Sequence, residues 1–427
     1  MNSLFIVNFY NIKPGPNGLC TKQVVREYVS RNNQAVILTR LIRRDQPRFE
    51  IQDGTEVYGL RRCLQAFPKE NRFVESIFQI WYRLLNLVWA VLGSRYWPLT
   101  DPLLAFRYYR KACRLYRQKP FDTVIGVYNG MDELFAATLI KRKFPQVRMI
   151  VYTLDALTGR QMQKSKRFER VHKKSLQKWE RTVFHAADMI CVMASHEAHY
   201  QKTFYDNIKE KIKYMDIPLL DLNRVQDTAQ KDTIHGELKK AVYTGYMCSY
   251  TGNPLYFLKI LQKIDGIEFH IYGTIEETLL AQIKATGLMD RLVFYHGQVS
   301  HEQIIQVQNA ADFLLNFGCI NPNMVSCKVF EYLSARKPII NLYRIQDDSS
   351  LPYLNAYPNA LQVFEDDNKL ADNIGKISAF FRRTDFITID EKFLLENYYN
   401  NLPIQMANII VGDRDKKVPG MLYKEKR

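Results

Sequence analysis

The chain has 427 residues, 47% hydrophobic and 24% charged, a composition that excludes a disordered protein and predicts two or three folded domains. The formal net charge is +16, but residues 1–217 hold 37 Lys and Arg against 19 Asp and Glu, and residues 218–427 hold 23 against 25. The first half therefore carries all the excess positive charge, which predicts an anionic partner: lipid headgroups, a lipid diphosphate or nucleic acid. Seven scattered cysteines without a CxxC pair, and a first strand in place of a secretory signal, favour the cytoplasm and disfavour a zinc site.

The first half shows the alternation of strands and helices that is typical of a parallel sheet. An apolar run at 4–9 precedes a glycine-bearing loop, NIKPGPNGLCT, a helix pattern at 22–31 and a second strand at 35–39. Further strands are expected at 123–127, 149–152 and 189–193, with a helix at 132–143. This is the strand–loop–helix–strand unit of an α/β domain.

Two other segments of the first half bear on contact with an anionic surface. Residues 73–92, FVESIFQIWYRLLNLVWAVL, form the most apolar window, but polar and charged side chains interrupt it, so a transmembrane span is disfavoured. The window predicts either a buried helix or a helix at a membrane surface, which Trp81 and Trp89 would suit. Residues 159–181 hold nine Lys and Arg and two acids, which favours a helix beside an anionic surface over a solvated face.

Residues 216–237 lack periodicity and predict an interdomain linker, after which strands and helices alternate again. Strands are expected at 241–244, 268–272, 292–295, 313–316 and 338–342, and helices at 253–264, 276–286, 302–310, 326–335, 367–383 and 390–411. We therefore predict an N-terminal domain at 1–217, a C-terminal domain at 218–395, and a helix with a basic tail at 396–427 that packs back on the first domain. Two doubly wound α/β domains facing a central cleft would bind a ligand at the carboxyl ends of their strands.

The segment SCKVFEYLSARKPII, residues 326–340, holds the pair of residues with the clearest chemistry. It predicts a short buried helix, a turn and a strand, and Lys328 and Glu331 share one helix face because they are three residues apart. A cation and an acid at a helix start suit a ligand that has both phosphates and hydroxyls. The alternative is that both are ordinary solvated side chains, as most lysines and glutamates are.

Four stretches resemble the family 4 glycosyltransferases and their bacterial polysaccharide-synthesis relatives, which have the GT-B fold. YHGQVSHEQIIQVQNAADFLLNF resembles the approach to the family's site, and GCINPNMVSCKVFEYLSARKPII resembles its nucleotide-sugar signature. WERTVFHAADMICVMASHEAHY is similar to the last helix and strand of the family's first domain, and VYTGYMCSYTGNPLYFLKIL, with FHIYG, to the first unit of the second. The resemblance covers roughly the full length and is loosest at 45–120.

The resemblance implies a site for a UDP- or GDP-type donor sugar in the second domain. Glu331 would accept hydrogen bonds from the ribose hydroxyls, and Lys328 would neutralise the diphosphate as it leaves, together with backbone N–H groups at the helix start. Two positions depart from the family: Asn323 replaces a glutamate that contacts the donor sugar, and Gly252 replaces an arginine that faces the diphosphate. The expected donor-binding residues are Asn323, Met324, Val325, Ser326, Lys328, Glu331, Gly245 and Gly273.

The first domain offers weaker candidates at the ends of its strands. Gly15 and Gly18 flank the first strand–helix loop, where glycines let the backbone approach an acceptor or a diphosphate, although a plain turn is the alternative. Asp155 is the catalytic candidate, as a base or as the group that orients the acceptor, unless it only caps a turn. Asn129 is a similar candidate after the strand at 123–127. No HEXXH, P-loop or DXD-type cluster stands at a strand end, so we expect neither a metal nor a cofactor.

The resemblance implies a retaining hexosyltransferase of cell-surface polysaccharide synthesis, which we expect to be metal-independent and peripheral at the inner face of the plasma membrane. Its partners would be a nucleotide sugar, a lipid-linked saccharide acceptor and, through the basic first half, an anionic membrane surface. Asn323 and Gly252 favour a rival: a non-catalytic homologue that serves as a binding or scaffold subunit of a polysaccharide assembly complex. Nucleic acid is disfavoured, because the sequence has no helix-turn-helix, zinc-finger or RNP pattern.

Overall fold

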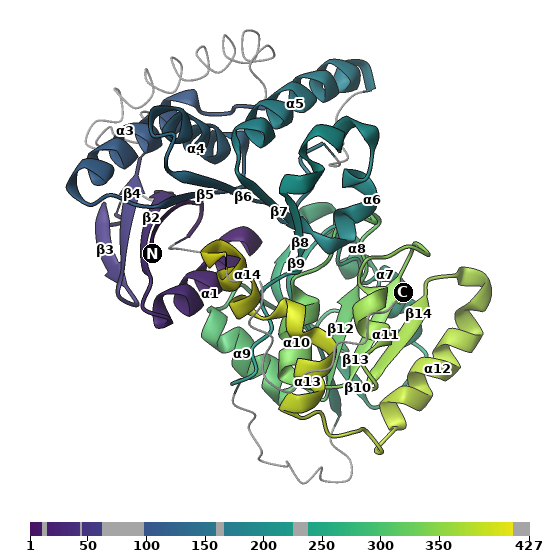
Figure 1. Cartoon of the computed structure of the whole chain (residues 1–427). Helices are drawn as coiled ribbons and strands as arrows, with labels where there is room; N and C mark the ends of the chain where they lie inside the picture. Colours follow the sequence, from purple (N-terminus) through teal and green to yellow (C-terminus); the bar gives the residue numbers. More distant parts are fainter. Residues whose placement is uncertain (11–14, 43–44, 62–97, 159–165, 225–237, 413–427) are drawn as a thin grey trace, which may run out of the picture. The chain divides into compact units, whose positions relative to one another are not determined.

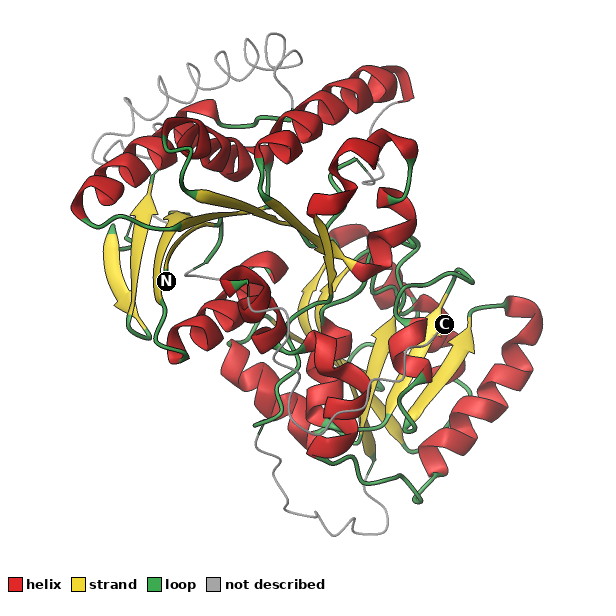
Figure 2. Cartoon of the chain, in the orientation of Figure 1, coloured by secondary structure: helices red, strands yellow, loops and turns green. Residues whose placement is uncertain are grey.

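The computed structural model describes residues 1–10, 15–42, 45–61, 98–158, 166–224 and 238–412, with the backbone alone for 166–172. The chain divides into two compact units: unit 1 comprises Met1–Pro218 and the stretch from Pro403 onward, and unit 2 comprises Leu219–Leu402. Each unit consists of helices packed on a mainly parallel sheet (Figure 1 and Figure 2). The apolar window at 73–92 and the first part of the basic stretch, 159–165, lie outside the described residues.

The sheet of unit 1 has eight strands in the order β3-β4-β2-β1-β5-β6-β7-β8. All neighbours pair in parallel except β3, which forms an antiparallel hairpin with β4 at the edge. β5 and β7, inside the sheet, are buried along their whole length, because helices cover both of its faces. The strands are β1 Asn2–Ile6, β2 Gln34–Arg40, β3 Phe49–Gln52, β4 Thr55–Leu60, β5 Thr123–Val127, β6 Arg148–Tyr152, β7 Met189–Met193 and β8 Ile212–Met215.

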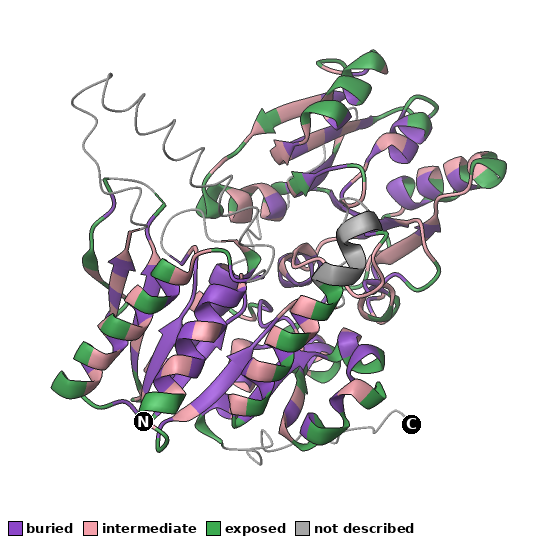
Figure 3. Ribbon diagram, turned by 90° about the horizontal axis from the view of Figure 1, so that it is seen from above, coloured by how far each residue is buried: buried purple, intermediate pink, exposed green. Residues whose placement is uncertain are grey.

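Helices lie on both faces of this sheet. α3, α4 and α5 cover one face, with the almost fully buried α4 between the other two, whose outer sides are exposed (Figure 1 and Figure 3). α1 and α14 cover the opposite face. The helices are α1 Pro16–Ser30, α3 Pro102–Gln118, α4 Met131–Lys143, α5 Lys166–Ala186, α6 Glu197–Tyr200 and α14 Pro403–Val411.

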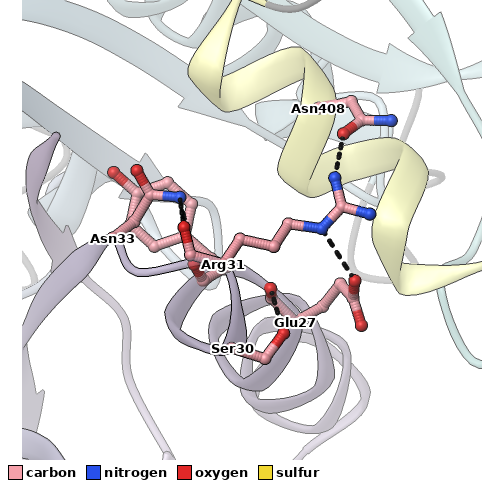
Figure 4. A network of polar contacts seen from close by, with 6 residues as sticks. Glu27, Ser30, Arg31, Asn33 and Asn408 are labelled. Carbon is pink, nitrogen blue, oxygen red and sulfur yellow. Dashed lines mark hydrogen bonds and ion pairs between the residues drawn. The ribbon is translucent and has the colours of Figure 1, made fainter. Parts of the chain in front are cut away.

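α14 joins unit 1 from the far end of the sequence. Arg31, just after α1, donates from Nη1 to Asn408 Oδ1 on α14 at 2.6 Å, and pairs through Nε with Glu27 at 2.9 Å (Figure 4). Arg148 at the start of β6 donates to the carbonyl oxygen of Ile410 at 2.7 Å, which satisfies one of the open carbonyls at the end of α14. The last described helix is therefore part of the first unit's core.

The sheet of unit 2 has six parallel strands in the order β11-β10-β9-β12-β13-β14, which is the strand order of the Rossmann fold. β9 and β10 pair over nine consecutive residues, from Lys239 with Ile267 to Met247 with Ile275. The strands are β9 Lys239–Met247, β10 Ile267–Ile275, β11 Val293–Gly297, β12 Phe313–Phe317, β13 Ile339–Tyr343 and β14 Ala360–Phe364.

Unit 2 has its own apolar core, built from aromatic and aliphatic side chains of these strands and of α7, α8 and α12. The single helix expected at 390–411 is wrong, because α13 ends at Tyr398 and the ring of Pro403, which removes a backbone donor, begins a new helix in unit 1. The helices are α7 Leu255–Leu261, α8 Glu277–Ala285, α9 His301–Ala310, α10 Lys328–Ala335, α11 Leu351–Asn355, α12 Leu370–Arg382 and α13 Glu391–Tyr398.

The structure corrects the predicted linker at 216–237. Leu220 N–H donates to the carbonyl oxygen of Asn401 at 3.0 Å, and Arg224 is only 8% exposed, so this part of the segment is packed into unit 2. β3, β4, β8, β14, α3, α6 and α11 were not expected. Within the described part of the chain, no helix has the length and apolar character needed to cross a bilayer.

Candidate functional site

The strand order of unit 2 reverses between β9 and β12, and the two strands separate at that point. β9 pairs with β12 only at Ala241 and Val242, whereas it pairs with β10 along its whole length. In open α/β sheets a ligand binds where neighbouring strands diverge, at their carboxyl ends. In this unit the place is formed by the end of β9, the loop at 318–327 and the start of α10.

α10 is fixed against the end of β9 by one buried hydroxyl. The Thr244 N–H, which has no β12 partner, donates to Tyr332 Oη at 3.0 Å. Tyr332 is completely buried, and burial raises the pKa of its phenol. A buried N–H group without an acceptor would destabilise the fold, so Tyr332 both satisfies β9 and sets the position of the helix.

Two glycines, which have no side chains, allow the start of α10 to pack closely against β9 and β10. A Cβ on Gly245 would lie 2.1 Å from Lys328 Cε, so the lysine stem lies directly on the backbone of β9. A Cβ on Gly273, the β10 partner of Gly245, would lie 1.9 Å from the Gly245 carbonyl oxygen. Their φ values of +126° and +139° also favour glycine. The structure therefore brings three predicted donor-binding residues together: Gly245, Gly273 and Lys328.

Lys328 has an unusual electrostatic position for a lysine. It is the first residue of α10, at the end of the helix dipole where a cation is disfavoured. Its Nζ lies 5.2 Å from the centre of the Tyr243 ring, and it forms no ion pair with any described residue. The N–H groups of Val329 and Phe330 in the first turn already donate to the carbonyl oxygens of Ser326 and Cys327. The cation that lies on a backbone without side chains is therefore the feature that favours an anion such as a diphosphate.

Glu331 lies one turn further along the same helix and is half-buried, not buried as expected. Its Oε2 accepts a hydrogen bond of 3.3 Å from Gln308 Nε2, which also donates to Thr244 Oγ1 at 2.8 Å. Gln308 is 1% exposed, and its Oε1 is buried without a donor among the described residues. The half-buried carboxylate of Glu331, held in place by Gln308, is an acceptor that suits a ligand with hydroxyl groups.

Arg224 supports this site, although no sequence pattern indicates it. Its guanidinium donates to the carbonyl oxygens of Glu331 and Ile305 and to Asn309 Oδ1, at 2.8 to 2.9 Å, and so joins α9 to α10. Burial lowers the pKa of Arg224, and the nearby Glu331 raises it. Arg224 lies in the segment that the sequence predicts to be a linker. Its hydrogen-bond partners are therefore evident only from the structure.

Asp348 holds the loop at 318–327, although from the sequence it belongs to a polar loop. It is 4% exposed and accepts from Cys319 N at 3.1 Å and Ser350 N at 2.8 Å. A Cβ on Gly318 would lie 2.2 Å from its Oδ2, so this glycine permits the contact. Burial raises the pKa of Asp348, against the effect of these hydrogen bonds. The predicted residues Asn323, Met324, Val325 and Ser326 follow in this loop and are half-buried.

The two positions that depart from the family pattern, Gly252 and Asn323, have different structural surroundings. Gly252 has a φ of +66°, and a Cβ there would lie 2.4 Å from Tyr243 Oη, which donates to the Tyr246 carbonyl oxygen at 2.7 Å. An arginine at this position would need the loop to move. Asn323 N–H donates to Asn321 Oδ1 at 3.0 Å, which stabilises the turn before α10.

The switch point of unit 1, between β1 and β5, gathers amide side chains. Asn17 Nδ2, in the first turn of α1, donates to Asn129 Oδ1 at 2.8 Å and to the Tyr128 carbonyl oxygen at 2.5 Å. Asn129 Nδ2 donates to the carbonyl oxygen of Asn8 at 2.9 Å, and Tyr108 Oη to Asn8 Oδ1 at 2.7 Å. The predicted Asn129 is thus part of this cluster, and the other amides were missed.

The remaining candidates of unit 1 lie at the same carboxyl edge. Gly15 precedes α1 with an extended φ of −65°, and Gly18 is a helical residue of α1, so only Gly15 belongs to the loop as predicted. Asp155 follows β6 and is half-buried, and its carbonyl oxygen accepts from Thr153 Oγ1. Among the described residues, no group of three His, Cys, Asp or Glu side chains could hold a metal ion.

Comparisons with known proteins agree on the fold. No protein-family model and no curated protein sequence matches the chain. Among solved structures, it is similar to sucrose-phosphate synthase from Thermosynechococcus elongatus, with a TM-score of 0.67 at 12% identity over 96% of this chain and 98% of that one. The fold is that of the GT-B glycosyltransferases. The chain is also similar to Anabaena HepE in complex with UDP, with a TM-score of 0.60 at 14% identity over 97% and 99% of the two chains.

A third GT-B structure is the lipopolysaccharide outer core galactosyltransferase WaaB, with a TM-score of 0.54 at 12% identity over 97% of this chain and 100% of that one. Identities this low establish the fold and no more. The prediction of two Rossmann-like α/β domains is therefore confirmed, and the roles of single residues stay predictions.

Proposed function

We propose that this GT-B protein transfers a glycosyl unit from a nucleoside-diphosphate sugar to a lipid-linked saccharide acceptor. The observation that carries the proposal is the position of Lys328, whose stem lies on Gly245 at the switch point of unit 2. A solvated lysine would need neither the glycine nor the separation of β9 from β12. HepE is seen with UDP and with UDP-glucose, which supports a UDP-type donor here.

In the proposed reaction the bond between the sugar and the diphosphate loosens first. Negative charge then builds on the leaving diphosphate, where Lys328 stabilises it. Glu331 binds the ribose hydroxyls, Gln308 orients its carboxylate, and Arg224 and Tyr332 keep α10 in place without touching the donor. Retention of configuration and independence from metal are part of the proposal.

The acceptor is proposed to bind at the amide cluster of unit 1. Asn8, Asn17 and Asn129 offer neutral donors and acceptors, which suit the hydroxyls of a saccharide. The exposed cations of α5, which include Lys173, Lys174 and Lys178, would meet the anionic inner face of the membrane.

The first test is binding, followed by transfer. A donor that binds only the folded protein raises its melting temperature, so a panel of nucleotides and nucleotide sugars identifies the base and the sugar. Lys328→Ala is expected to lower kcat by about 10²–10³, the usual effect of removing one group that stabilises the charge of the transition state. Glu331→Ala is expected to weaken donor binding by about 10–100-fold, because a hydrogen bond to a charged group is lost.

Matched controls exist on α8 of the same unit, where Lys284 and Glu277 are exposed. Lys284→Ala and Glu277→Ala are expected to change neither binding nor transfer. A wild-type protein that binds no nucleotide in the panel and transfers no sugar contradicts the proposal.

A second candidate is a non-catalytic subunit of a polysaccharide assembly complex. It is favoured by Gly252, which leaves no room for a second cation at the diphosphate, and by the neutral Asn323. Nucleotide binding that Lys328→Ala abolishes, without turnover of any donor, would favour this candidate over the enzyme.

A further inference from the structure

Unit 1 contains a cavity of about 350 Å³ that is lined almost entirely by cations. It lies between α3 and the carboxyl end of β4, and none of its lining residues belongs to the amide cluster. Six of its eight lining residues are Arg or Lys, and none is acidic: Arg48, Gly59, Leu60, Arg61, Arg107, Arg110, Lys111 and Arg114. A cavity of this size accommodates a small phosphorylated group.

The sequence of α3 concentrates these charges on the cavity. Residues 102–118 contain five Arg and Lys and no acid. Arg107, Lys111 and Arg114 follow the i, i+4, i+7 spacing, which places them on one helix face. Like charges at this spacing destabilise a helix, so α3 bears a cost that an anion in the cavity would remove.

The described residues that line the cavity supply no such anion. Arg110 and Arg114 are exposed, and neither forms an ion pair within the described part of the chain. Burial, and then the charge of Arg114, lowers the pKa of Lys111, and the neighbouring Glu56 only partly opposes that shift. The positive charge of this face is therefore compensated only in part by its described neighbours.

Contacts inside unit 1 hold part of the cation set in place. Arg107 Nη1 donates to the carbonyl oxygen of Arg61, which ties α3 to the end of β4. Lys111 is held against Tyr58 on the same strand, with its Nζ 3.7 Å from the centre of the ring. Side chains that are already ordered lose less conformational entropy when they bind a ligand.

We propose that this cavity binds a phosphate or diphosphate group of a second ligand. Guanidinium groups pair with phosphate oxygens in a bidentate way, and several of them surround the cavity. The site differs from the proposed donor site, since all its residues belong to unit 1 and the donor residues to unit 2.

The phosphate group could come from a lipid or from a soluble sugar phosphate. Leu103 and Phe106 of α3 are 61% and 49% exposed, and the Arg110 guanidinium lies 6.0 Å from the Phe106 ring. Apolar side chains beside the cations suit a phosphate that carries an acyl or isoprenyl chain. We therefore expect the lipid source to bind more tightly.

The test compares two double variants, one within α3 and one at its end and just after it, that remove the same charge. Arg110→Gln with Arg114→Gln changes the cavity lining, and Arg117→Gln with Lys119→Gln removes two exposed cations at the end of the helix, outside the lining. Each full-length protein is titrated with inorganic pyrophosphate and with glucose 6-phosphate by calorimetry. Each is also floated with phosphatidylcholine vesicles, with and without phosphatidylglycerol.

The cavity variant is expected to lose at least tenfold in affinity for anionic vesicles, whereas the control variant keeps wild-type affinity within about twofold. A tenfold loss confined to the soluble phosphates would support the site and assign it to a soluble ligand. Equal losses in both variants, or no loss in either, would overturn the proposal, because the charge would then act diffusely or not at all. Thermal melting without ligand shows that both variants are folded, and the cavity variant is expected to melt no lower than the control, since repulsion is relieved.

Discussion

The strand order reverses between β9 and β12 in unit 2, and between β1 and β5 in unit 1, yet different side chains occupy the two places. At the carboxyl end of β9, Lys328 lies on Gly245 with no described acid to neutralise it. At the carboxyl ends of β1 and β5, Asn8, Asn17 and Asn129 bond to one another and to the backbone. One topology thus presents a cation in unit 2 and neutral amides in unit 1.

The positive charge of the first half lies outside the amide cluster of unit 1. The surplus predicted an anionic partner, and the described cations of α3 and α5 lie on helices that cover the sheet, not in the amide cluster. One acid near that cluster, Glu133, is completely buried, and burial, together with Asp132, raises its pKa well above the usual range. Arg40 opposes that shift. Unit 1 therefore has two different regions: a neutral one at the carboxyl ends of β1 and β5, and a basic one on the helices that cover the sheet.

The largest expected effect on nucleotide binding comes from Gly245→Ala, which tests the charged site of unit 2. The added Cβ would overlap Lys328 Cε at 2.1 Å, in a backbone conformation that favours glycine. Displacement of the ammonium group is expected to weaken nucleotide binding by about 100-fold, or about 2.7 kcal/mol. Calorimetric titration with the nucleotide selected by the panel measures this.

Gly375→Ala is the matched control, because Gly375 lies in α12 and a Cβ added there would point into open space. It is expected to keep nucleotide affinity and to stabilise unit 2 by about 0.5–1 kcal/mol, since alanine is the better helix former. Unchanged nucleotide affinity in Gly245→Ala would mean that the contact of the Lys328 stem with Gly245 does not matter for binding. The difference between a charged site in unit 2 and a neutral site in unit 1 would then be unsupported.

Much of the fold could be predicted from the sequence, because strands buried on both faces, such as β5 and β7, are continuous apolar runs. The hairpin of β3 and β4 was missed although its signal is present: Asp53 and Gly54 form its turn, with φ values of +49° and +75°. An Asp-Gly pair between alternating residues is a strong hairpin pattern. For α3, Asp101 before Pro102 is a usual helix start, and Asp101 Oδ1 indeed accepts from Leu104 N at 3.0 Å.

The site could be predicted only where its residues are neighbours in sequence. Lys328 and Glu331 are three residues apart, so their common helix face follows from spacing. Asp348 holds the N–H of Cys319, 29 residues earlier, and Arg224 bonds to Glu331, 107 residues later. Such contacts depend on how strands and helices pack, and no local pattern reports them.

A smaller effect is expected from Asn17→Ala, which tests the neutral site of unit 1. The change removes the donor to Asn129 Oδ1 and to the Tyr128 carbonyl oxygen, and Asn17 is 7% exposed, so water replaces these bonds poorly. We expect a loss of about 1–3 kcal/mol in unfolding free energy and a rise in the KM for the acceptor, with donor affinity unchanged. Chemical denaturation and steady-state kinetics measure the two effects.

Asn207→Ala, at an exposed position of unit 1, serves as its control and should change neither quantity. A parallel loss of donor affinity in Asn17→Ala would show that the two switch points do not bind different ligands.

The one effect that depends on pH concerns Glu180, a second buried acid of unit 1. Glu180 is completely buried on α5 and accepts from Tyr205 Oη at 3.0 Å, and burial raises its pKa to about 7. Below the unfolded pKa of about 4.5, both states are protonated and the stabilising contribution of the raised pKa is complete. As the pH rises through 7, the folded state must release a proton that it holds more tightly than the unfolded chain does, so this contribution is lost.

Glu180→Gln keeps an acceptor for Tyr205 Oη but cannot ionise, so it lacks this pH dependence. The unfolding free energy of wild type minus that of the variant is therefore expected to fall between pH 5 and pH 8, by at most about 3 kcal/mol. The pKa of the nearby His199, which burial lowers to about 4, makes stability rise with pH in the acid range, but it does so in both proteins and cancels in the difference. Melting curves at pH 5, 6, 7 and 8, with the exposed Glu197→Gln as control, measure the slope. A difference that stays constant across this range would mean that Glu180 is ionised throughout, and that unit 1 is not built from neutral groups as its amide cluster indicates.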